Sequence, residues 1–344
     1  MKTSEFSYHL PEELIAQTPV EPRDSSRLLV LARATGQMEY RTFRDVVDYL
    51  RPGDLLVAND SRVIPARLYG RRPETGGRVE ALLLTRREPD LWEALVRPGK
   101  RLREGGLIEF GCDGQVVEAR IVGRTPSGGR LLAFPPDAAS VLEKIGVTPL
   151  PPYIKAPLAD PTRYQTIYAR ERGSVAAPTA GLHFTPRLVE QVEAMGVRFA
   201  FTTLHIGLDT FRPVQEEEVE AHQIHTEYAV LGAETAAAIN QTRAAGGKVI
   251  AVGTTAVRTL ETAAKAAAEG EAVGPYSGWT DLYIYPGYRF RAVDALITNF
   301  HLPRSTLLML VFAFAGRELI LAAYREAVAR AYRFYSFGDA MLIL

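Results

Sequence analysis

The sequence predicts an α/β fold into which a small β-rich module is inserted. Helical and strand-like patterns alternate over the first 60 residues and again after Tyr164, whereas short strand-like runs without a helix fill the stretch between about residues 63 and 135. The chain has 344 residues and is long enough for two domains. We therefore assign residues 1–60 and 150–344 to one discontinuous α/β domain and residues 61–149 to an inserted β domain.

The inserted module is expected to be a small antiparallel barrel or a sandwich, because turn-forming pairs such as Pro98-Gly99 separate its short runs. Before it, we expect a helix over Thr42–Leu50 and a strand over Asp54–Asn59; after it, Pro149-Leu-Pro-Pro152 predicts a rigid linker. The predicted strands of the module are Val63–Tyr69, Arg78–Thr85, Leu91–Val96, Leu107–Phe110, Gln115–Gly123 and Arg130–Phe134.

One αβ unit between Gly173 and Val214 carries two polar clusters. Thr185 is a suitable N-cap, Pro186 suits the first helical position and Gly196 suits a left-handed helix end, so we expect a helix followed by the strand Val197–Leu204. The clusters precede the helix and follow the strand, which places both at the end where α/β proteins bind ligands. Their members are Pro178, Thr179, Gly181, His183 and Phe184, and then Thr203, His205, Gly207, Asp209, Thr210 and Arg212.

A further turn, Val252-Gly-Thr-Thr-Ala-Val-Arg258, opens a helix whose free amide hydrogens suit an anion. On spacing alone, an ordinary capped turn with Arg258 paired to Glu261 is the favoured alternative. The polar segment Asn299–Thr306 either faces a ligand or caps the helix that follows it. The other predicted elements are strands Lys248–Val252, Asp281–Tyr285 and Arg289–Ile297, and helices Ala256–Ala268, Ser305–Ala315 and Glu318–Tyr332.

Five of the six histidines follow residue 180, and we interpret them as proton carriers or as buried hydrogen-bonded side chains. They are His183, His205, His222, His225 and His301. A metal site at the HxxH pair His222 and His225 is the weaker interpretation, because neither cysteine nor an HExxH context accompanies it. The carboxylates near these segments are Asp209, Glu227, Asp281, Asp294 and Asp339, and most such groups are merely solvated.

Composition is that of an ordinary globular protein, with 47% hydrophobic and 23% charged residues and a formal net charge of zero. The single cysteine, Cys112, excludes an intrachain disulfide and favours a reducing compartment. The N-terminus has no apolar signal core, and the longest apolar run, Leu307–Ala315, is too short to span a bilayer. We therefore expect a cytoplasmic protein without a membrane partner.

The inserted module is locally basic. Residues 61–110 contain eleven Lys and Arg against seven Asp and Glu, and Arg97, Lys100, Arg101 and Arg103 lie within seven residues. This cluster is compatible with contacts to an RNA backbone, although a solvated surface explains it equally well.

Long sequence blocks carry more information than the local patterns, from Arg23-Asp-Ser-Ser-Arg27 and Ala176-Ala-Pro-Thr-Ala-Gly-Leu-His-Phe184 to Thr298-Asn-Phe-His-Leu-Pro303. In these and the other blocks given below, the chain resembles the S-adenosylmethionine:tRNA ribosyltransferase-isomerases of queuosine biosynthesis almost from end to end. Asp209 departs from the family pattern, where many members have glycine, and Ile224-His225-Thr226 replaces Met-His-Ser. The matching blocks are Arg23-Asp-Ser-Ser-Arg27, Asn59-Asp-Ser-Arg-Val-Ile-Pro-Ala-Arg67, Pro149-Leu-Pro-Pro-Tyr-Ile154, Tyr164-Gln165, Ala176-Ala-Pro-Thr-Ala-Gly-Leu-His-Phe184, Leu204-His-Ile-Gly-Leu-Asp-Thr-Phe-Arg-Pro-Val214, Ala251-Val-Gly-Thr-Thr255, Thr298-Asn-Phe-His-Leu-Pro303 and Tyr332-Arg-Phe-Tyr-Ser-Phe-Gly-Asp-Ala-Met341.

The resemblance implies a tRNA-modifying transferase. The ribosyl part of S-adenosylmethionine is transferred to 7-aminomethyl-7-deazaguanine at the tRNA wobble position and isomerised, which gives epoxyqueuosine and releases adenine and methionine. It also implies a large α/β domain with a distorted, barrel-like mixed sheet and an inserted small antiparallel β-barrel. We expect no metal and no cofactor, since S-adenosylmethionine is a substrate, and we expect a monomer.

The matching motifs supply positions, and we assign the roles as hypotheses. Proton transfer is assigned to polar residues of the α/β domain, namely His183, His205, His225, Glu227 and Asp281. An aromatic face, of Phe184, Phe211 or Tyr153, is expected to contact the sulfonium, and Arg258 the methionine carboxylate. Substrate binding is assigned to Thr179, Phe184, Phe211, Arg212, Thr254, Thr255, Arg258, Asn299 and His301. RNA binding is assigned to Arg97, Lys100, Arg101 and Arg103.

Two other classes of function stay open at this point. A tRNA methyltransferase would use the same S-adenosylmethionine and release S-adenosylhomocysteine. A noncatalytic RNA-binding module would need only the basic β module, and the dense His, Asp and Arg blocks of the α/β part exceed that need.

Overall fold

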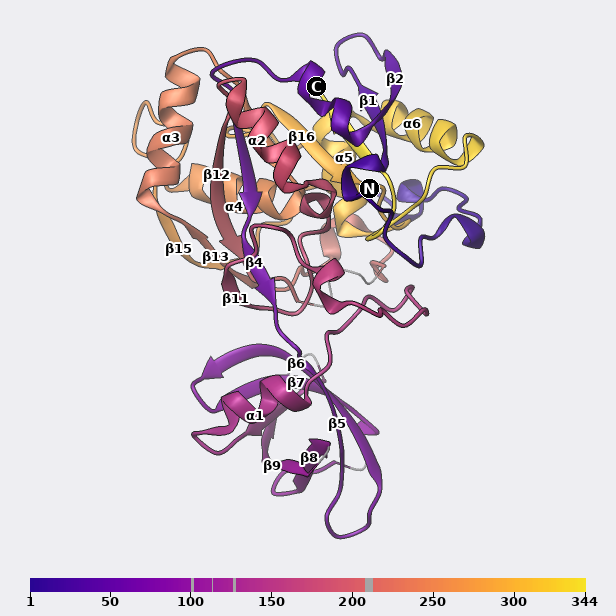
Figure 1. Ribbon diagram of the computed structural model, residues 1–344, viewed down its shortest axis with the longest axis vertical. Helices are drawn as coiled ribbons and strands as arrows, with labels where there is room; N and C mark the ends of the chain where they lie inside the picture. Colours follow the sequence, from indigo (N-terminus) through magenta and orange to yellow (C-terminus); the bar gives the residue numbers. More distant parts are fainter. Residues whose placement is uncertain (100–101, 113, 126–127, 208–212) are drawn as a thin grey trace. The chain divides into compact units, whose positions relative to one another are not determined.

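A nine-stranded mixed sheet organises the larger part of the chain in the computed structural model, which describes residues 1–99, 102–112, 114–125, 128–207 and 213–344 (Figure 1). The chain divides into two compact units. The α/β unit comprises Met1–Ser61, Pro151–Glu171 and Ala177–Leu344, and the barrel unit comprises Arg62–Leu150 and Arg172–Ala176.

The sheet of the α/β unit has the strand order β15-β13-β12-β3-β14-β16-β17-β1-β2. Its four central neighbours β12, β3, β14 and β16 run parallel, β1 is parallel to β17, and the other pairs are antiparallel. The strands are β1 (Arg27–Leu31), β2 (Met38–Thr42), β3 (Leu55–Asn59), β12 (Arg198–Leu204), β13 (Glu227–Leu231), β14 (Val249–Val252), β15 (Tyr276–Thr280), β16 (Ala295–Asn299) and β17 (Ala340–Ile343).

The central strands are buried on both faces, because helical segments cover the sheet from both sides. In β1, Leu29 and Leu31 pack in one hydrophobic core, while Leu28 and Val30 pack in the other, as the period of two requires. The first core lies against α3 (Ala233–Ala244), α4 (Thr254–Lys265), α5 (Thr306–Ala315) and α6 (Arg317–Ala329). The second lies against the 3-10 segments η4 (Phe43–Tyr49) and η7 (Thr179–His183) and against α2 (Pro186–Ala194).

Local sequence signals fix several of these elements as predicted. The Thr185 hydroxyl accepts a hydrogen bond from the Leu188 N–H at 3.2 Å, Pro186 occupies the first position of α2, and Gly196 has a φ of 82°. Ser305 caps α5 in the same way through the Leu308 N–H. The helix expected from these signals after Thr185 is therefore confirmed.

Three predicted elements differ in the structure. The helix expected over Thr42–Leu50 is the 3-10 segment η4, and the strand expected over Arg289–Ile297 is confined to β16. The segment Asp281–Tyr285 forms no strand, and β15 precedes it instead. Leu282 and Ile284 alternate in burial because this extended segment packs beside α4, where the Leu282 carbonyl accepts from Arg258.

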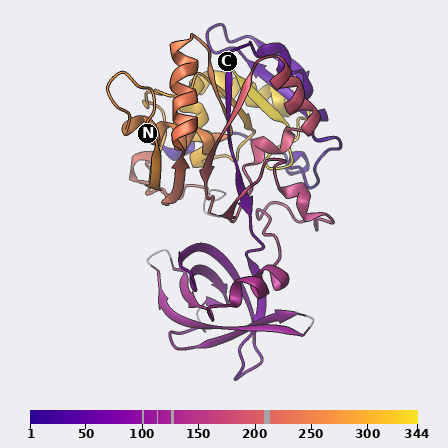
Figure 2. The ribbon, with the colours of Figure 1, turned by 60° about the vertical axis from the view of Figure 1, so that its left-hand side comes forward.

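The barrel unit is a closed barrel of six strands in the order β10-β7-β6-β5-β8-β9, which decides between the two predicted architectures. All neighbouring strands are antiparallel. Leu68, Ala81, Phe110, Ile121 and Leu132 fill its interior with no exposed surface. Its elements are β5 (Arg67–Arg71), β6 (Arg78–Glu88), β7 (Leu91–Arg97), β8 (Leu107–Cys112), β9 (Gln115–Arg124), β10 (Arg130–Ala133) and α1 (Ala138–Ile145), the helix that lies against the barrel (Figure 2).

Two short strands, β4 (Ser61–Val63) and β11 (Glu171–Ser174), pair where the chain leaves and rejoins the α/β unit. No single helix among the described residues is long and apolar enough to cross a membrane. The pair α5 and α6 reaches the required length and apolarity only when taken together, and the two helices meet at a bend of 115°.

Candidate active site

Polar residues gather at one edge of the sheet in the α/β unit. The parallel strands β12, β3, β14 and β16 all end there, and the antiparallel β17 begins there, since Asn299 pairs with Ala340. Each strand end is followed by hydrogen-bonding side chains. We call this the carboxyl edge, and it is the edge at which open α/β sheets bind ligands.

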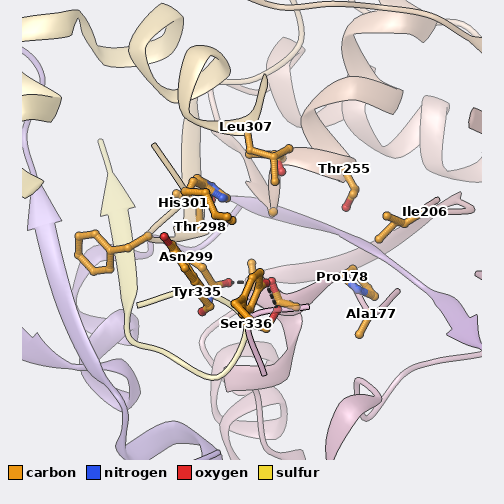
Figure 3. A pocket seen from close by; sticks show the side chains of 17 residues that line it. Ala177, Pro178, Ile206, Thr255, Thr298, Asn299, His301, Leu307, Tyr335 and Ser336 are labelled. Atoms are coloured by element: carbon orange, nitrogen blue, oxygen red, sulfur yellow. Dashed lines mark hydrogen bonds between the residues drawn. The ribbon is translucent and has the colours of Figure 1, made fainter. Parts of the chain in front are cut away.

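A pocket of about 530 Å³, counting the part open to solvent, lies at the carboxyl edge (Figure 3). Most of its wall is apolar, with hydroxyl and amide groups at intervals. The lining residues are Tyr153, Ala177, Pro178, Thr179, Ala180, Ile206, Gly253, Thr254, Thr255, Thr298, Asn299, Phe300, His301, Leu302, Leu307, Tyr335 and Ser336.

Asn299 is held in one orientation by three bonds. Its Oδ1 accepts from the Thr179 hydroxyl at 3.3 Å, and its Nδ2 donates to the Tyr335 carbonyl at 3.1 Å and to His183 Nε2 at 3.2 Å. The other ring nitrogen of His183, Nδ1, lies 2.7 Å from the Ser26 hydroxyl. Asn299 therefore requires His183 Nε2 as an acceptor, which leaves the ring proton on Nδ1.

His183 is a buried, neutral support for this arrangement. Its ring stacks on Phe43 with centroids 4.9 Å apart, and burial, aided by Arg23 and Arg333, lowers its pKa to about 3. Both ring nitrogens are occupied. His183 therefore positions Asn299 at the pocket wall and has no nitrogen left for a substrate.

His301 is fixed in a similar way. Its Nε2 lies 2.7 Å from the Thr298 hydroxyl, and its backbone N–H donates to the Tyr324 hydroxyl at 2.9 Å. Burial lowers its pKa to about 3. On the opposite wall the Tyr153 and Ser336 hydroxyls are 2.7 Å apart, and the rings of Tyr153 and Tyr335 are 4.7 Å apart.

The start of α4 forms another part of the wall. Gly253 has a φ of 93°, a conformation that side chains rarely tolerate, and a Cβ at that position would lie 3.4 Å from the Ala180 Cβ. Thr254 and Thr255 follow it and line the pocket, both buried. The Thr255 hydroxyl is shielded from solvent and has no hydrogen-bond partner among the described residues.

A buried ion pair of Glu227 and Arg258 lies beside this helix. Arg258 Nη1 contacts Glu227 Oε2, and Arg258 Nε donates to the Leu282 carbonyl at 3.1 Å. Glu227 Oε1 accepts from the Gly207 N–H at 2.9 Å. Both side chains are 6% exposed. The pair ties the start of β13 to α4 and to the chain just after β12.

Asp60, at the end of β3, organises a second polar cluster at the carboxyl edge. Its carboxylate accepts from the Thr203 hydroxyl at 2.7 Å and from Arg170 at 2.8 Å, and burial raises its pKa. His205 follows β12 in this region, and its next neighbour, Ile206, lines the pocket.

His205 differs from His183 in having a ring without hydrogen-bond partners among the described residues. Its Nδ1 is shielded from solvent and unpartnered. Burial lowers its pKa, while Glu171 and Asp60 oppose the shift. His205 itself does not line the pocket, but a neutral imidazole with a free nitrogen at the carboxyl edge is suited to accept a proton.

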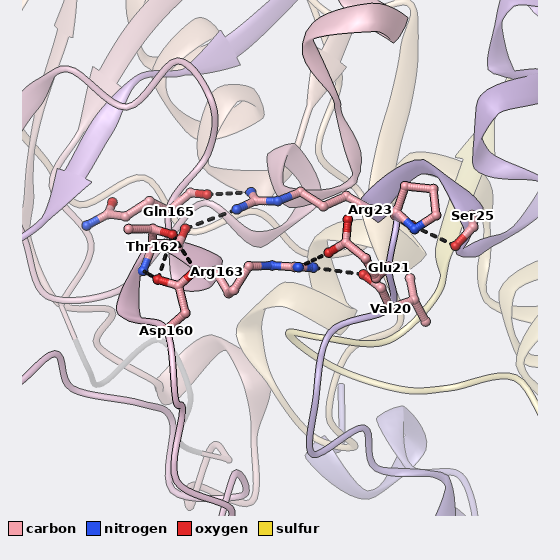
Figure 4. Close-up of polar contacts among 9 residues, drawn as sticks. Val20, Glu21, Arg23, Ser25, Asp160, Thr162, Arg163 and Gln165 are labelled. Carbon is pink, nitrogen blue, oxygen red and sulfur yellow. Dashed lines mark hydrogen bonds and ion pairs between the residues drawn. The ribbon is translucent and has the colours of Figure 1, made fainter.

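The segment Arg23–Arg27 is scaffolding for the site. Arg23 donates to the carbonyls of Gln165 and Thr162 at 2.6 and 3.0 Å, while Arg163 forms an ion pair with Glu21 (Figure 4). These bonds fasten residues 160–165 to the stretch that precedes β1. Further bonds connect the rest of the segment to the α/β unit, because Asp24 accepts from Thr185, Ser26 bonds His183, and Arg27 pairs with Asp339.

Comparisons with known proteins agree with this architecture. Residues 3–343 match the family described as "Queuosine biosynthesis protein". The chain is 58% identical to the S-adenosylmethionine:tRNA ribosyltransferase-isomerase of Symbiobacterium thermophilum and 59% identical to that of Moorella thermoacetica, with all of each chain covered. The chain belongs to this family. A crystal structure of S-adenosylmethionine tRNA ribosyltransferase from Thermotoga maritima is also similar, with 45% identity, a TM-score of 0.57, and 99% of this chain and all of that chain covered.

The mixed sheet with its separate β-barrel agrees with the fold expected for this family. The structure also shows where the residues with predicted roles lie. Thr179, Thr254, Thr255, Asn299 and His301 line the pocket together. Arg97 and Arg103 are exposed on the barrel unit. Phe211, Arg212, Lys100 and Arg101 lie outside the described residues.

Several predicted roles need correction. Phe184 has no exposed surface and packs on Phe43 and Phe199 in the core, so its ring does not reach a substrate. Arg258 is paired with Glu227 through Nη1 and does not line the pocket, so it is not placed to bind the substrate's carboxylate there, although its buried Nη2 has no hydrogen-bond partner among the described residues. The alternative pairing of Arg258 was wrong as well, because Glu261 instead accepts from the backbone of Arg291 and Ala292 and from Tyr288. His225 and Asp281 are exposed and do not line the pocket.

Tyr153, expected as an aromatic contact to the sulfonium, lines the pocket. Among the lining residues that sequence analysis did not single out are Ile206, Leu307, Tyr335 and Ser336. Ile206, Tyr335 and Ser336 fall within blocks that resemble the family, but nothing in their local spacing indicates a common site. Tyr335 has a positive φ of 70°, a strained conformation visible only in three dimensions. Among the described residues, no group of three or more His, Cys, Asp or Glu side chains is arranged to hold a metal, and His222 bonds Glu216.

The buried histidines predict a pH-dependent stability. The folded pKa of His183 lies near 3, below the unfolded value of about 6.5, so its contribution is present above pH 6.5 and is lost as pH falls towards 3. Between pH 7 and pH 5 the loss is about 2 kcal/mol. We expect the free energy of unfolding, measured by urea denaturation, to fall between pH 7 and pH 5 in the unsubstituted protein. In His183→Gln this fall should be smaller by about 2 kcal/mol. The exposed His9→Gln is the control and should leave the drop unchanged; an equal drop in His183→Gln would contradict the burial argument.

Proposed function

We propose that this protein transfers and isomerises the ribosyl moiety of S-adenosylmethionine onto 7-aminomethyl-7-deazaguanine at the tRNA wobble position. The products are epoxyqueuosine in the tRNA, adenine and methionine. Identities of 58% and 59% over the whole chain to S-adenosylmethionine:tRNA ribosyltransferase-isomerases carry this proposal. The pocket at the carboxyl edge supports it with a mostly apolar wall that carries hydroxyl and amide groups.

The pocket is proposed to hold S-adenosylmethionine. Its aromatic side chains Tyr153 and Tyr335 present ring faces that attract a sulfonium cation. Asn299 supplies a fixed amide, and the threonines of α4 supply hydroxyls and backbone amides.

His205 is proposed as the proton acceptor. The sulfonium acidifies the adjacent C5′, so an unprotonated base is needed there, and the attacking amine must also lose its proton. A ring that is neutral near pH 7 and free of hydrogen-bond partners among the described residues supports this role for His205. His183 has both ring nitrogens engaged, which supports a positioning role.

Product analysis tests the reaction. The protein is incubated with S-adenosylmethionine and tRNA carrying 7-aminomethyl-7-deazaguanine, and the small molecules are separated. Adenine and methionine are expected in equal amounts, and tRNA with unmodified guanine at the wobble position is the control that should yield neither. S-adenosylhomocysteine would make the protein a methyltransferase, and absence of turnover with intact RNA binding would make it a binding module.

The barrel unit is proposed to contribute RNA affinity through its β5-β6-β7 face. Tyr69 is 53% exposed on β5, opposite Glu80 of β6, which in turn lies opposite Arg97 of β7. The adjoining row pairs Arg71 with Arg78. Arg78 and Arg97 are exposed and form no ion pair within the described residues. An exposed ring among free cations suits a stacked base and its phosphates.

Replacing Arg78 and Arg97 together by Ala should flatten the slope of log affinity for tRNA against log salt by up to about 1.4. Tyr69→Ala should weaken binding by about 1–3 kcal/mol with the slope unchanged, and Tyr69→Phe should restore it. Arg120 and Arg124 on β9, across the barrel from β6, form the matched control pair. Equal effects from the two arginine pairs would show a diffuse charge effect and would overturn the assignment of this face.

We further infer that the protein acts in the cytoplasm as a monomer and needs no cofactor. The single cysteine and a tRNA substrate support the compartment. Turnover in a mixture of protein, S-adenosylmethionine and modified tRNA without an added organic cofactor, together with the mass in solution from light scattering, tests the other two inferences.

A further inference from the structure

We propose that the N-terminus of α4 is the subsite that binds the carboxylate of the amino-acid end of S-adenosylmethionine. The inference rests on the proposed function, and it fixes which end of the substrate faces which wall of the pocket. It also replaces Arg258 as the carboxylate partner.

The backbone at the start of α4 presents free donors. The first intrahelical bond runs from the Val257 N–H to the Gly253 carbonyl at 3.3 Å, so the N–H groups of Thr254, Thr255 and Ala256 precede the helical ladder. No side chain caps them, because the N-cap residue is Gly253. The dipole of a helix of 12 residues adds positive potential at this end.

The Thr255 hydroxyl is an independent sign of a ligand. The residue is 8% exposed, and its hydroxyl has no hydrogen-bond partner among the described residues. Figure 3 shows this hydroxyl directed towards the pocket. Buried hydroxyls in folded proteins are nearly always bonded, so an unbonded one at a pocket wall indicates a missing partner.

Of the anionic groups on the two substrates, the carboxylate at the amino-acid end of S-adenosylmethionine suits these donors better than an RNA phosphate. The described lining residues include no Lys or Arg, so the free amides and the dipole at the start of α4 are what the pocket wall offers an anion. Burial of Thr254 and Thr255 at 6% and 8% exposure excludes the phosphate of a bulky RNA backbone. The remaining anionic group of the two substrates is the methionine carboxylate.

The test compares two ligands by calorimetry, namely S-adenosylmethionine and its analogue in which hydrogen replaces the carboxylate. Thr255→Val should weaken binding of S-adenosylmethionine about tenfold, because a hydrogen bond to a charged group is lost, and should leave binding of the decarboxylated analogue unchanged. Thr259→Val is the matched control, since this buried threonine lies one turn further on and bonds the Thr255 carbonyl. It should alter neither affinity.

Two outcomes would overturn the inference. Equal weakening of both ligands by Thr255→Val would assign the hydroxyl to the adenosyl part, and equal affinity of both ligands for the unsubstituted protein would remove the carboxylate contact altogether. In either case adenine and methionine would still form from S-adenosylmethionine if the proposed function holds, so the two failures are distinguishable.

Discussion

Replacing His205 by Ala is expected to lower turnover by about 10²–10⁴, the range typical of a lost acid or base. The melting temperature should change little, because the ring is only partly buried and bonds no described residue. Single-turnover formation of adenine, measured beside thermal unfolding, separates the two effects. His183→Ala should mainly lower stability, since it leaves the buried Ser26 hydroxyl and one Asn299 N–H without their partner, at about 1–3 kcal/mol each, while turnover of the folded protein falls less than in His205→Ala.

The pH profile sharpens this expectation for His205. A base must be unprotonated to act, and burial lowers the pKa of His205, so kcat/KM should hold at neutral pH and fall only below about 6.5. His205→Gln should lose that acid limb along with most of its activity. If both His205 variants keep near-normal turnover, the proton acceptor is a different group, and Asp60 is the next to replace.

Replacing Glu227 by Ala is expected to destabilise the α/β unit by about 3–5 kcal/mol, because Arg258 would be left charged in a site where it is only 6% exposed. Urea denaturation measures this loss. The control is Glu318→Ala, which removes an exposed partner of Arg317 and should cost at most about 1 kcal/mol.

A double replacement shows whether the stability lost in Glu227→Ala comes from the unpaired buried charge of Arg258 or from the lost packing of the pair. Glu227→Leu combined with Arg258→Met removes both charges at once, and it should recover much of the stability lost in Glu227→Ala. A double variant as unstable as the single one would show that the pair is needed for packing at the junction of β13 and α4.

Much of the architecture could be predicted from local patterns. The helix α2 was predictable because Thr185, Pro186 and Gly196 each satisfy a backbone requirement at a known place. The six barrel strands were predictable from short runs between turn signals, although closure into a barrel depends on pairing β10 with both β7 and β9. The polar strand ends could be placed at one edge by the direction of parallel strands alone.

The contacts that decide roles lie too far apart in the sequence for such patterns. Ser26 and His183 are separated by 157 residues, and their bond turns a candidate base into a support. The sequence spacing would allow Arg258 to pair with Glu261, but in the folded protein it pairs with Glu227. The alternating Asp281–Tyr285 segment shows the same limit, because burial beside α4 mimics the period of a strand.

Where S-adenosylmethionine binds is tested most directly by a crystal structure of the protein grown with it. The expected result is electron density in the pocket at the carboxyl edge, with the carboxylate within hydrogen-bond distance of the Thr254 and Thr255 amides and the sulfonium beside Tyr153. Density for the ligand at a different place, with this pocket empty, would contradict the assignment of the pocket and of every role built on it.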